Sequence, residues 1–93
     1  MIQLENKHHE IIISILAKYP YQFYAYGSRV KAQAKQYSDL DLCFYEEIPL
    51  NILSHIQEVL EESDIPFKVK VMAWEWISPK FQKLIKSDLV PIK

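Results

Sequence analysis

The 93-residue sequence has very little glycine and cysteine, one residue of each. A lone cysteine, Cys43, cannot form a disulfide within the chain or supply a cysteine-based zinc site, and it suits a reducing compartment. Eleven Lys and Arg stand against twelve Asp and Glu, so the chain also lacks the basic excess with which proteins coat nucleic acid. We therefore expect no nucleic acid as a direct ligand.

Long apolar runs and linkers are lacking as well. No apolar run approaches the roughly 20 residues of a membrane span, and no repeat, low-complexity tract or Gly/Ser linker interrupts the sequence. We predict one domain over residues 1–93, cytoplasmic and without membrane association. Because so short a chain buries a limited fraction of its surface, association with a second copy or with another protein stays open.

The patterns that are present alternate between helix and strand. Helical spacing of apolar residues covers four segments, at about residues 6–18, 29–37, 49–62 and from 78 onward. Period-two alternation predicts three strands, at 22–26, 39–45 and 67–74. This order predicts an α/β (α+β) fold with a small mixed sheet whose helices lie mainly on one face.

The last predicted helix follows Ser78-Pro79, a pair that favours a helix start. Its apolar residues Phe81, Leu84 and Ile85 are expected to be buried. Just before it, Trp74 and Trp76 fit either core packing or a partner interface.

The only glycine, Gly27, lies between the first predicted strand and the next predicted helix. Glycine lets bare backbone N–H groups approach an anion, and a helix N-terminus adds a partial positive charge. Ser28 adds a hydroxyl donor, and Arg29 is placed to add a bidentate phosphate contact. These residues together predict a phosphate-binding site. The alternative is that Ser28 only caps the predicted helix.

Asp39 and Asp41 are two residues apart on the second predicted strand, so they project from the same face. Two such carboxylates can share a hard divalent cation such as Mg²⁺, which keeps several waters and completes its shell with phosphate oxygens. An exposed acidic strand is the plain alternative. If the two strands pair, the phosphate site and the metal site meet at one edge of the sheet.

The spacing of these residues is Gly27-Ser28, ten residues, then Asp39-Leu40-Asp41. It resembles the signature of the minimal nucleotidyltransferase family within the polymerase-beta-like superfamily, and the similarity extends over nearly the whole chain. The resemblance implies a nucleotidyltransferase-like fold, Mg²⁺ in a site for up to two metals, and ATP or another nucleoside triphosphate as substrate. Asp39 and Asp41 would then be the catalytic metal ligands, and Gly27, Ser28 and Arg29 the nucleotide-binding residues.

The resemblance also implies a reaction and a partner. The reaction is attack on the α-phosphate, transfer of a nucleoside monophosphate and departure of pyrophosphate. Proteins of this family typically pair with a HEPN-domain protein, in some cases as an antitoxin that adds AMP to a tyrosine of a HEPN toxin.

Lys70 departs from the family pattern, because it stands where a third acidic residue is expected on the next strand. Ala73 takes the place of a further aspartate. We expect Lys70 to share the sheet face of Asp39 and Asp41, where its ammonium can pair with them or contact a triphosphate.

Three interpretations follow from that departure. The chain is an enzyme with Glu75 or Glu46 as substitute base, a nucleotide-binding protein without activity, or an antitoxin subunit that acts by binding a HEPN toxin.

Overall fold

The computed structural model describes residues 2–92. Over these residues the α-helices are α1 (Asn6–Leu16), α2 (Leu50–Glu62) and α3 (Pro79–Ile85). The strands are β1 (Tyr24–Tyr26), β2 (Leu40–Phe44), β3 (Val69–Ala73) and β4 (Val90–Pro91). Two short 3-10 helices, η1 (Trp74–Trp76) and η2 (Lys86–Asp88), flank α3. No helix in this range is long and apolar enough to cross a membrane.

The four strands form one sheet in the order β3-β2-β1-β4. Strands β2 and β3 run parallel, whereas β1 is antiparallel to both β2 and β4. The predicted small mixed sheet is therefore confirmed. The edge strand β4 was not predicted, because two residues ending in a proline give no alternating pattern.

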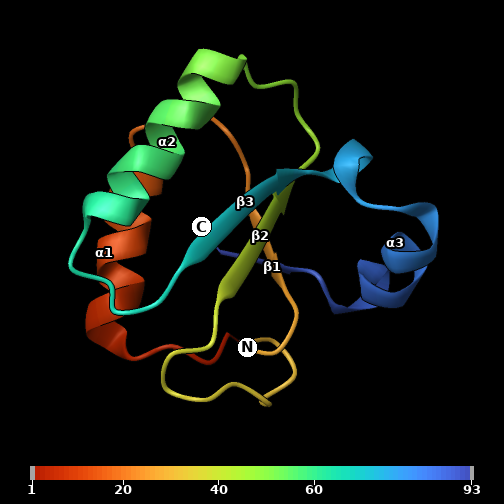
Figure 1. Ribbon diagram of the computed structural model, residues 1–93, viewed down its shortest axis with the longest axis horizontal. Helices are drawn as coiled ribbons and strands as arrows, with labels where there is room; N and C mark the ends of the chain where they lie inside the picture. The colour runs from red at the N-terminus through yellow and green to blue at the C-terminus, as the bar shows by residue number, and fades with distance from the viewer. Residues whose placement is uncertain (1, 93) are drawn as a thin grey trace.

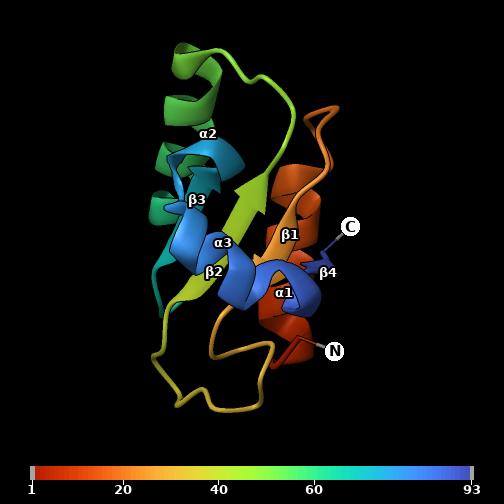
Figure 2. The same cartoon turned by 90° about the vertical axis from the view of Figure 1, so that its right-hand side faces the viewer.

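The alternation along β2 and β3 decides how the layers form. Leu40, Leu42 and Phe44 of β2 share one face with Val69 and Val71 of β3, and all five are buried. That face packs against α1 and α2, which lie side by side (Figure 1). Figure 2 shows α3 on the opposite side of the sheet. Two of the three helices thus cover one face, as the sequence predicts.

The second face has a smaller core, made of Tyr26, Cys43, Ile77 and Ile85. The expectation that Phe81 and Leu84 would also be buried is wrong, since they are 43% and 62% exposed. The reason is that α3 has only seven residues, and Ile85 is its one buried residue. Much of this helix therefore faces away from the protein.

The helix expected over residues 29–37 is not formed. A single helical turn begins at Gly27, whose carbonyl accepts hydrogen bonds from the N–H groups of Val30 and Lys31. The turn ends at Ala32, whose φ of 57° is left-handed. Residues 33–39 then continue without regular helix or strand to Leu40, where β2 begins. Asp39, expected inside the strand, lies just before it.

Candidate active site

Pairing of β1 with β2 brings the glycine turn against the aspartates. Tyr26, the last residue of β1, is opposite Asp41 of β2. Gly27 follows with a φ of 86°, a conformation that side chains disfavour. A Cβ atom at this position would lie 2.9 Å from Oδ2 of Asp41. Only glycine therefore lets the backbone come this close to the carboxylate.

Lys70 occupies the same face, as predicted. The register places it opposite Asp41, and its Nζ lies 3.1 Å from Oδ2 of Asp39. Both side chains are nearly half exposed, 48% for Lys70 and 42% for Asp39. The hydrogen bond to Asp39, with the negative charges of Asp39 and Asp41, raises the pKa of Lys70. The lysine ammonium thus partly offsets the negative charge of the two carboxylates.

Asp41, like Asp39, is of intermediate exposure. Burial raises the pKa of its carboxyl, the positive charge of Lys70 opposes that rise, and the charge of Asp39 adds to it. Tyr26 beside it has its pKa raised to about 12, by burial first and then by the charge of Asp41. The site therefore combines a partly desolvated carboxylate with a second one that is open to solvent. This arrangement suits a metal ion that keeps some of its water.

The structure gives Arg29 a different role from the expected phosphate contact. Its side chain is buried, with 5% exposed. The guanidinium donates hydrogen bonds to the backbone carbonyls of Ser38, Gln3 and Gln36, at 2.9, 2.8 and 3.2 Å. It also lies 4.0 Å from the ring centroid of Phe67. Arg29 thus holds the loop that leads to Asp39, and its Nε, Nη1 and Nη2 atoms all donate to backbone carbonyls.

Gln3 is a second loop-holding residue, and sequence reasoning missed it. Its backbone N–H donates to the carbonyl of Arg29, and its side-chain amide exchanges two hydrogen bonds of 3.2 Å with the backbone of Ala34. No local sequence signal identifies such a residue, because its partners lie about 30 positions away. On the other side of the loop, Lys31 pairs with Asp88 at 3.3 Å.

This geometry agrees with a comparison of whole sequences. The chain is 39% identical over 97 residues to "Probable protein adenylyltransferase MntA" of Haemophilus influenzae, which covers 98% of this chain and 85% of that protein. The chain belongs to the minimal nucleotidyltransferase family. No protein-family model matches the chain. A crystal structure described as a "putative nucleotidyltransferase" from Sulfolobus solfataricus is 19% identical, with a TM-score of 0.49 over 90% of this chain and 74% of that one.

For a minimal nucleotidyltransferase, this chain offers few acids at the site. Within residues 2–92, no group of three or more His, Cys, Asp and Glu side chains is placed to hold a metal ion. Asp39 and Asp41 are therefore the candidate metal ligands. Two carboxylates fit Mg²⁺, because waters and substrate phosphates supply its other ligands.

The two glutamates considered as substitute bases lie at the wrong end of the sheet. Glu46 follows β2 and Glu75 follows β3, each five residues past Asp41 and Lys70 respectively. The three strand residues beyond Asp41 and beyond Lys70 already span about 10 Å at about 3.3 Å per residue, and each glutamate lies two residues further along the chain. Oε1 of Glu46 also accepts a 2.6 Å hydrogen bond from the N–H of Gln22. Both glutamates line the hollow where β2 and β3 end, which neither Asp39 nor Asp41 lines.

Two hollows in the surface also lie away from the aspartates. The larger, of about 620 Å³, lies between the N-terminal segment and residues 34–37, with Arg29 and Phe67 in its lining. The smaller, of about 390 Å³, lies where β2 and β3 end. Neither is lined by Asp39 or Asp41. The candidate metal site thus lies on the second sheet face, where the interior strand β2 begins.

Proposed function

We propose that the chain is a Mg²⁺-dependent nucleotidyltransferase that uses ATP, and that residues 1–93 make up this one domain. The observation that carries the proposal is the close approach of Gly27 to Asp41, with Asp39 two residues away on the same face. The name of the Haemophilus relative, a probable protein adenylyltransferase, supports ATP as the nucleotide and a protein as the acceptor.

In this proposal the chain's residues hold the triphosphate and its metal. The backbone at Gly27 and the hydroxyl of Ser28 bind phosphate oxygens, because the absent Cβ leaves the turn open. Asp39 and Asp41 would hold Mg²⁺, which would offset the negative charge that develops on the phosphates during transfer. The acceptor hydroxyl forms a bond to the α-phosphorus, the bond to pyrophosphate breaks, and the hydroxyl proton passes to solvent.

Lys70 changes this scheme in one respect. An ammonium cannot accept the proton of the acceptor or bind a cation, so the chain lacks the carboxylate expected there. If Asp39 held the metal, the Lys70 ammonium would be available to contact the triphosphate. We therefore propose slow transfer, limited by activation of the acceptor.

The proposed acceptor is a tyrosine hydroxyl of a HEPN-domain protein, with the two proteins acting as toxin and antitoxin. A second candidate function is favoured by the 3.1 Å pair between Lys70 and Asp39. In that alternative the chain transfers nothing and acts by binding the HEPN protein, with or without nucleotide.

Incubation of the chain and its HEPN partner with α-labelled ATP and Mg²⁺ distinguishes nucleotidyl transfer from the binding function. The proposal predicts label on a partner tyrosine, identified by mass spectrometry as one AMP. Asp41→Asn should abolish the label, whereas Asp64→Asn, an exposed acid after α2, should retain it. A stable complex without label would support the binding alternative, and neither label nor complex would contradict both.

A further inference from the structure

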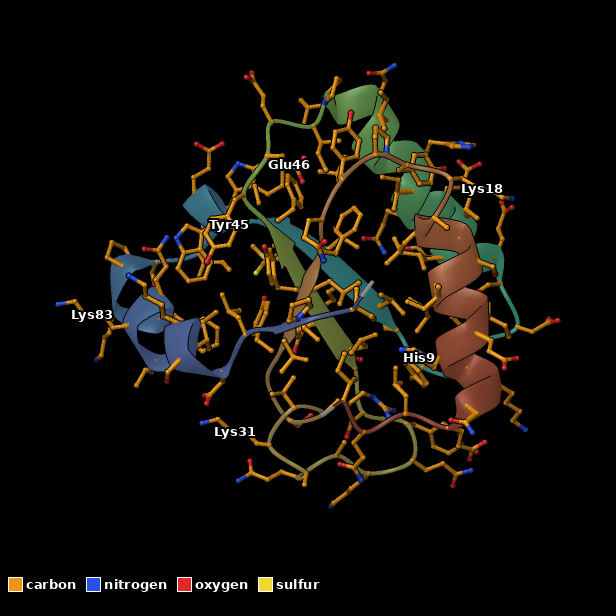
Figure 3. The ribbon with its side chains drawn as sticks, turned by 180° about the vertical axis from the view of Figure 1, so that it is seen from behind. His9, Lys18, Lys31, Tyr45, Glu46 and Lys83 are labelled. Atoms are coloured by element: carbon orange, nitrogen blue, oxygen red, sulfur yellow. The ribbon has the colours of Figure 1, made fainter. Side chains whose placement is uncertain are left out.

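The smaller hollow, at the end of the sheet opposite Asp41, has an unusual lining. It lies between the segment after β2 and the start of η1, and its lining residues are Phe44, Tyr45, Glu46, Glu47, Ala73, Trp74 and Glu75. Figure 3 shows Tyr45 and Glu46 at one end of the sheet and Lys31, from the glycine turn, at the other. Because of this separation, an inference about the hollow does not rest on the proposed nucleotidyl transfer.

Aromatic rings form one part of the lining. The rings of Tyr45 and Trp74 lie 5.1 Å apart at an angle of 39°, and Tyr24 contacts Tyr45 edge-on at 5.5 Å. Tyr45 nevertheless remains 52% exposed. Trp76, which packs on Phe44 at 6.3 Å, is 50% exposed. The rings are therefore held in place by their neighbours while part of their surface is free for a ligand.

Carboxylates form the other part. Glu46, Glu47 and Glu75 line the hollow, and none of its lining residues is a lysine or an arginine. The ion pairs found within residues 2–92 involve none of the three. Glu46 is fixed by its hydrogen bond from Gln22. The hollow thus combines uncompensated negative charge with exposed ring surface, and both features attract a cation.

We propose that this hollow binds an arginine side chain of a partner protein. A guanidinium is flat and weakly hydrated, so it stacks on an aromatic ring while its N–H groups reach carboxylates on either side. A lysine ammonium matches this combination less well, because it is a compact and strongly hydrated charge. The occupant is not a second copy of this chain, whose only arginine, Arg29, is buried.

Tryptophan fluorescence can report on binding, because the chain has only two tryptophans. Trp74 lines the hollow, and Trp76 packs on the lining residue Phe44. The probe is a short peptide with two arginines, and its control is the same peptide with neutral citrulline in their place. Tryptophan fluorescence should change saturably with the arginine peptide and not with citrulline, and added salt should weaken the binding. No saturable change up to about 10 mM arginine peptide would overturn the proposal.

Substitutions of the glutamates test whether the arginine peptide binds in the hollow. Glu47→Gln with Glu75→Gln should weaken the arginine peptide about fivefold or more, because two carboxylates lose their charge. Glu61→Gln with Glu62→Gln, an equal change at exposed positions of α2, should leave the affinity unchanged. The assignment would be contradicted if a citrulline peptide or a lysine peptide bound as tightly as the arginine peptide. An unchanged affinity in the Glu47 and Glu75 variant whose thermal unfolding matches that of the original chain would contradict it as well.

Discussion

Gly27 is required by two independent features, its φ of 86° and the 2.9 Å that would separate a Cβ from Asp41. Gly27→Ala should therefore lower the free energy of unfolding by about 1–3 kcal/mol. It should also push Asp41 away from the turn and weaken nucleotide binding. Urea unfolding followed by tryptophan fluorescence measures the first effect.

A matched control is available at Ala32, the one described non-glycine residue with a positive φ. Ala32→Gly should leave stability unchanged or raise it by up to about 1 kcal/mol, because glycine accepts this conformation without strain. Equal losses in the two variants would contradict the account of Gly27.

Arg29 illustrates a role that the sequence misassigns. Next to Gly-Ser, an arginine is typical of a phosphate ligand, yet here it donates to three backbone carbonyls and stacks on Phe67. Arg29→Lys should cost about 2–4 kcal/mol of unfolding free energy, because lysine cannot replace the three-way bonding. Calorimetric melting tests this, and an unchanged melting temperature with weaker ATP binding would restore the phosphate role.

Lys70 is the residue on which the proposed slow transfer depends. Lys70→Asp should increase Mg²⁺-dependent ATP turnover at least about tenfold, because a carboxylate near Asp39 and Asp41 restores a base and a metal ligand. Lys18→Asp, the same charge change at an exposed position just after α1, should have little effect. A folded Lys70→Asp variant without added turnover would show that the missing carboxylate is not the limiting feature.

At the scale of elements, the sequence correctly predicted the strands that show a local alternating pattern. Alternation identified β2 and β3, and the shared face of Asp41 and Lys70 followed from it. The helix predicted over residues 29–37 does not form, because its helical pattern rests on Val30 and Ala34 alone. Its conformation is set instead by the distant residue Gln3 and by the buried guanidinium of Arg29.

The segment over 33–38 is therefore expected to loosen when its distant support is removed. Gln3→Ala should lower the unfolding free energy by about 1–2 kcal/mol and speed amide hydrogen exchange over residues 33–38, because two hydrogen bonds to Ala34 are lost. Gln33→Ala is the control, at an exposed position in the same segment. Unchanged exchange in the Gln3 variant would show that Arg29 alone holds the segment.

At the scale of the whole molecule, the two ends of the sheet differ in their chemistry. The end with Gly27, Asp39 and Asp41 was predictable, since strand pairing was the only long-range step that the spacing required. The aromatic and acidic hollow at the other end was not, because it gathers the segments after β2 and β3 from about 30 residues apart in the sequence. The same separation removed Glu46 and Glu75 from the list of catalytic bases.

The central claim is that Gly27, Ser28, Asp39 and Asp41 form one site for a metal-bound triphosphate. Calorimetric titration of ATP, with and without Mg²⁺, into the original chain and into Asp39→Asn and Asp41→Asn tests it most directly. We predict saturable binding that requires Mg²⁺ and is lost in both variants. Binding that is equally tight without the metal, or that survives both substitutions, would contradict the claim.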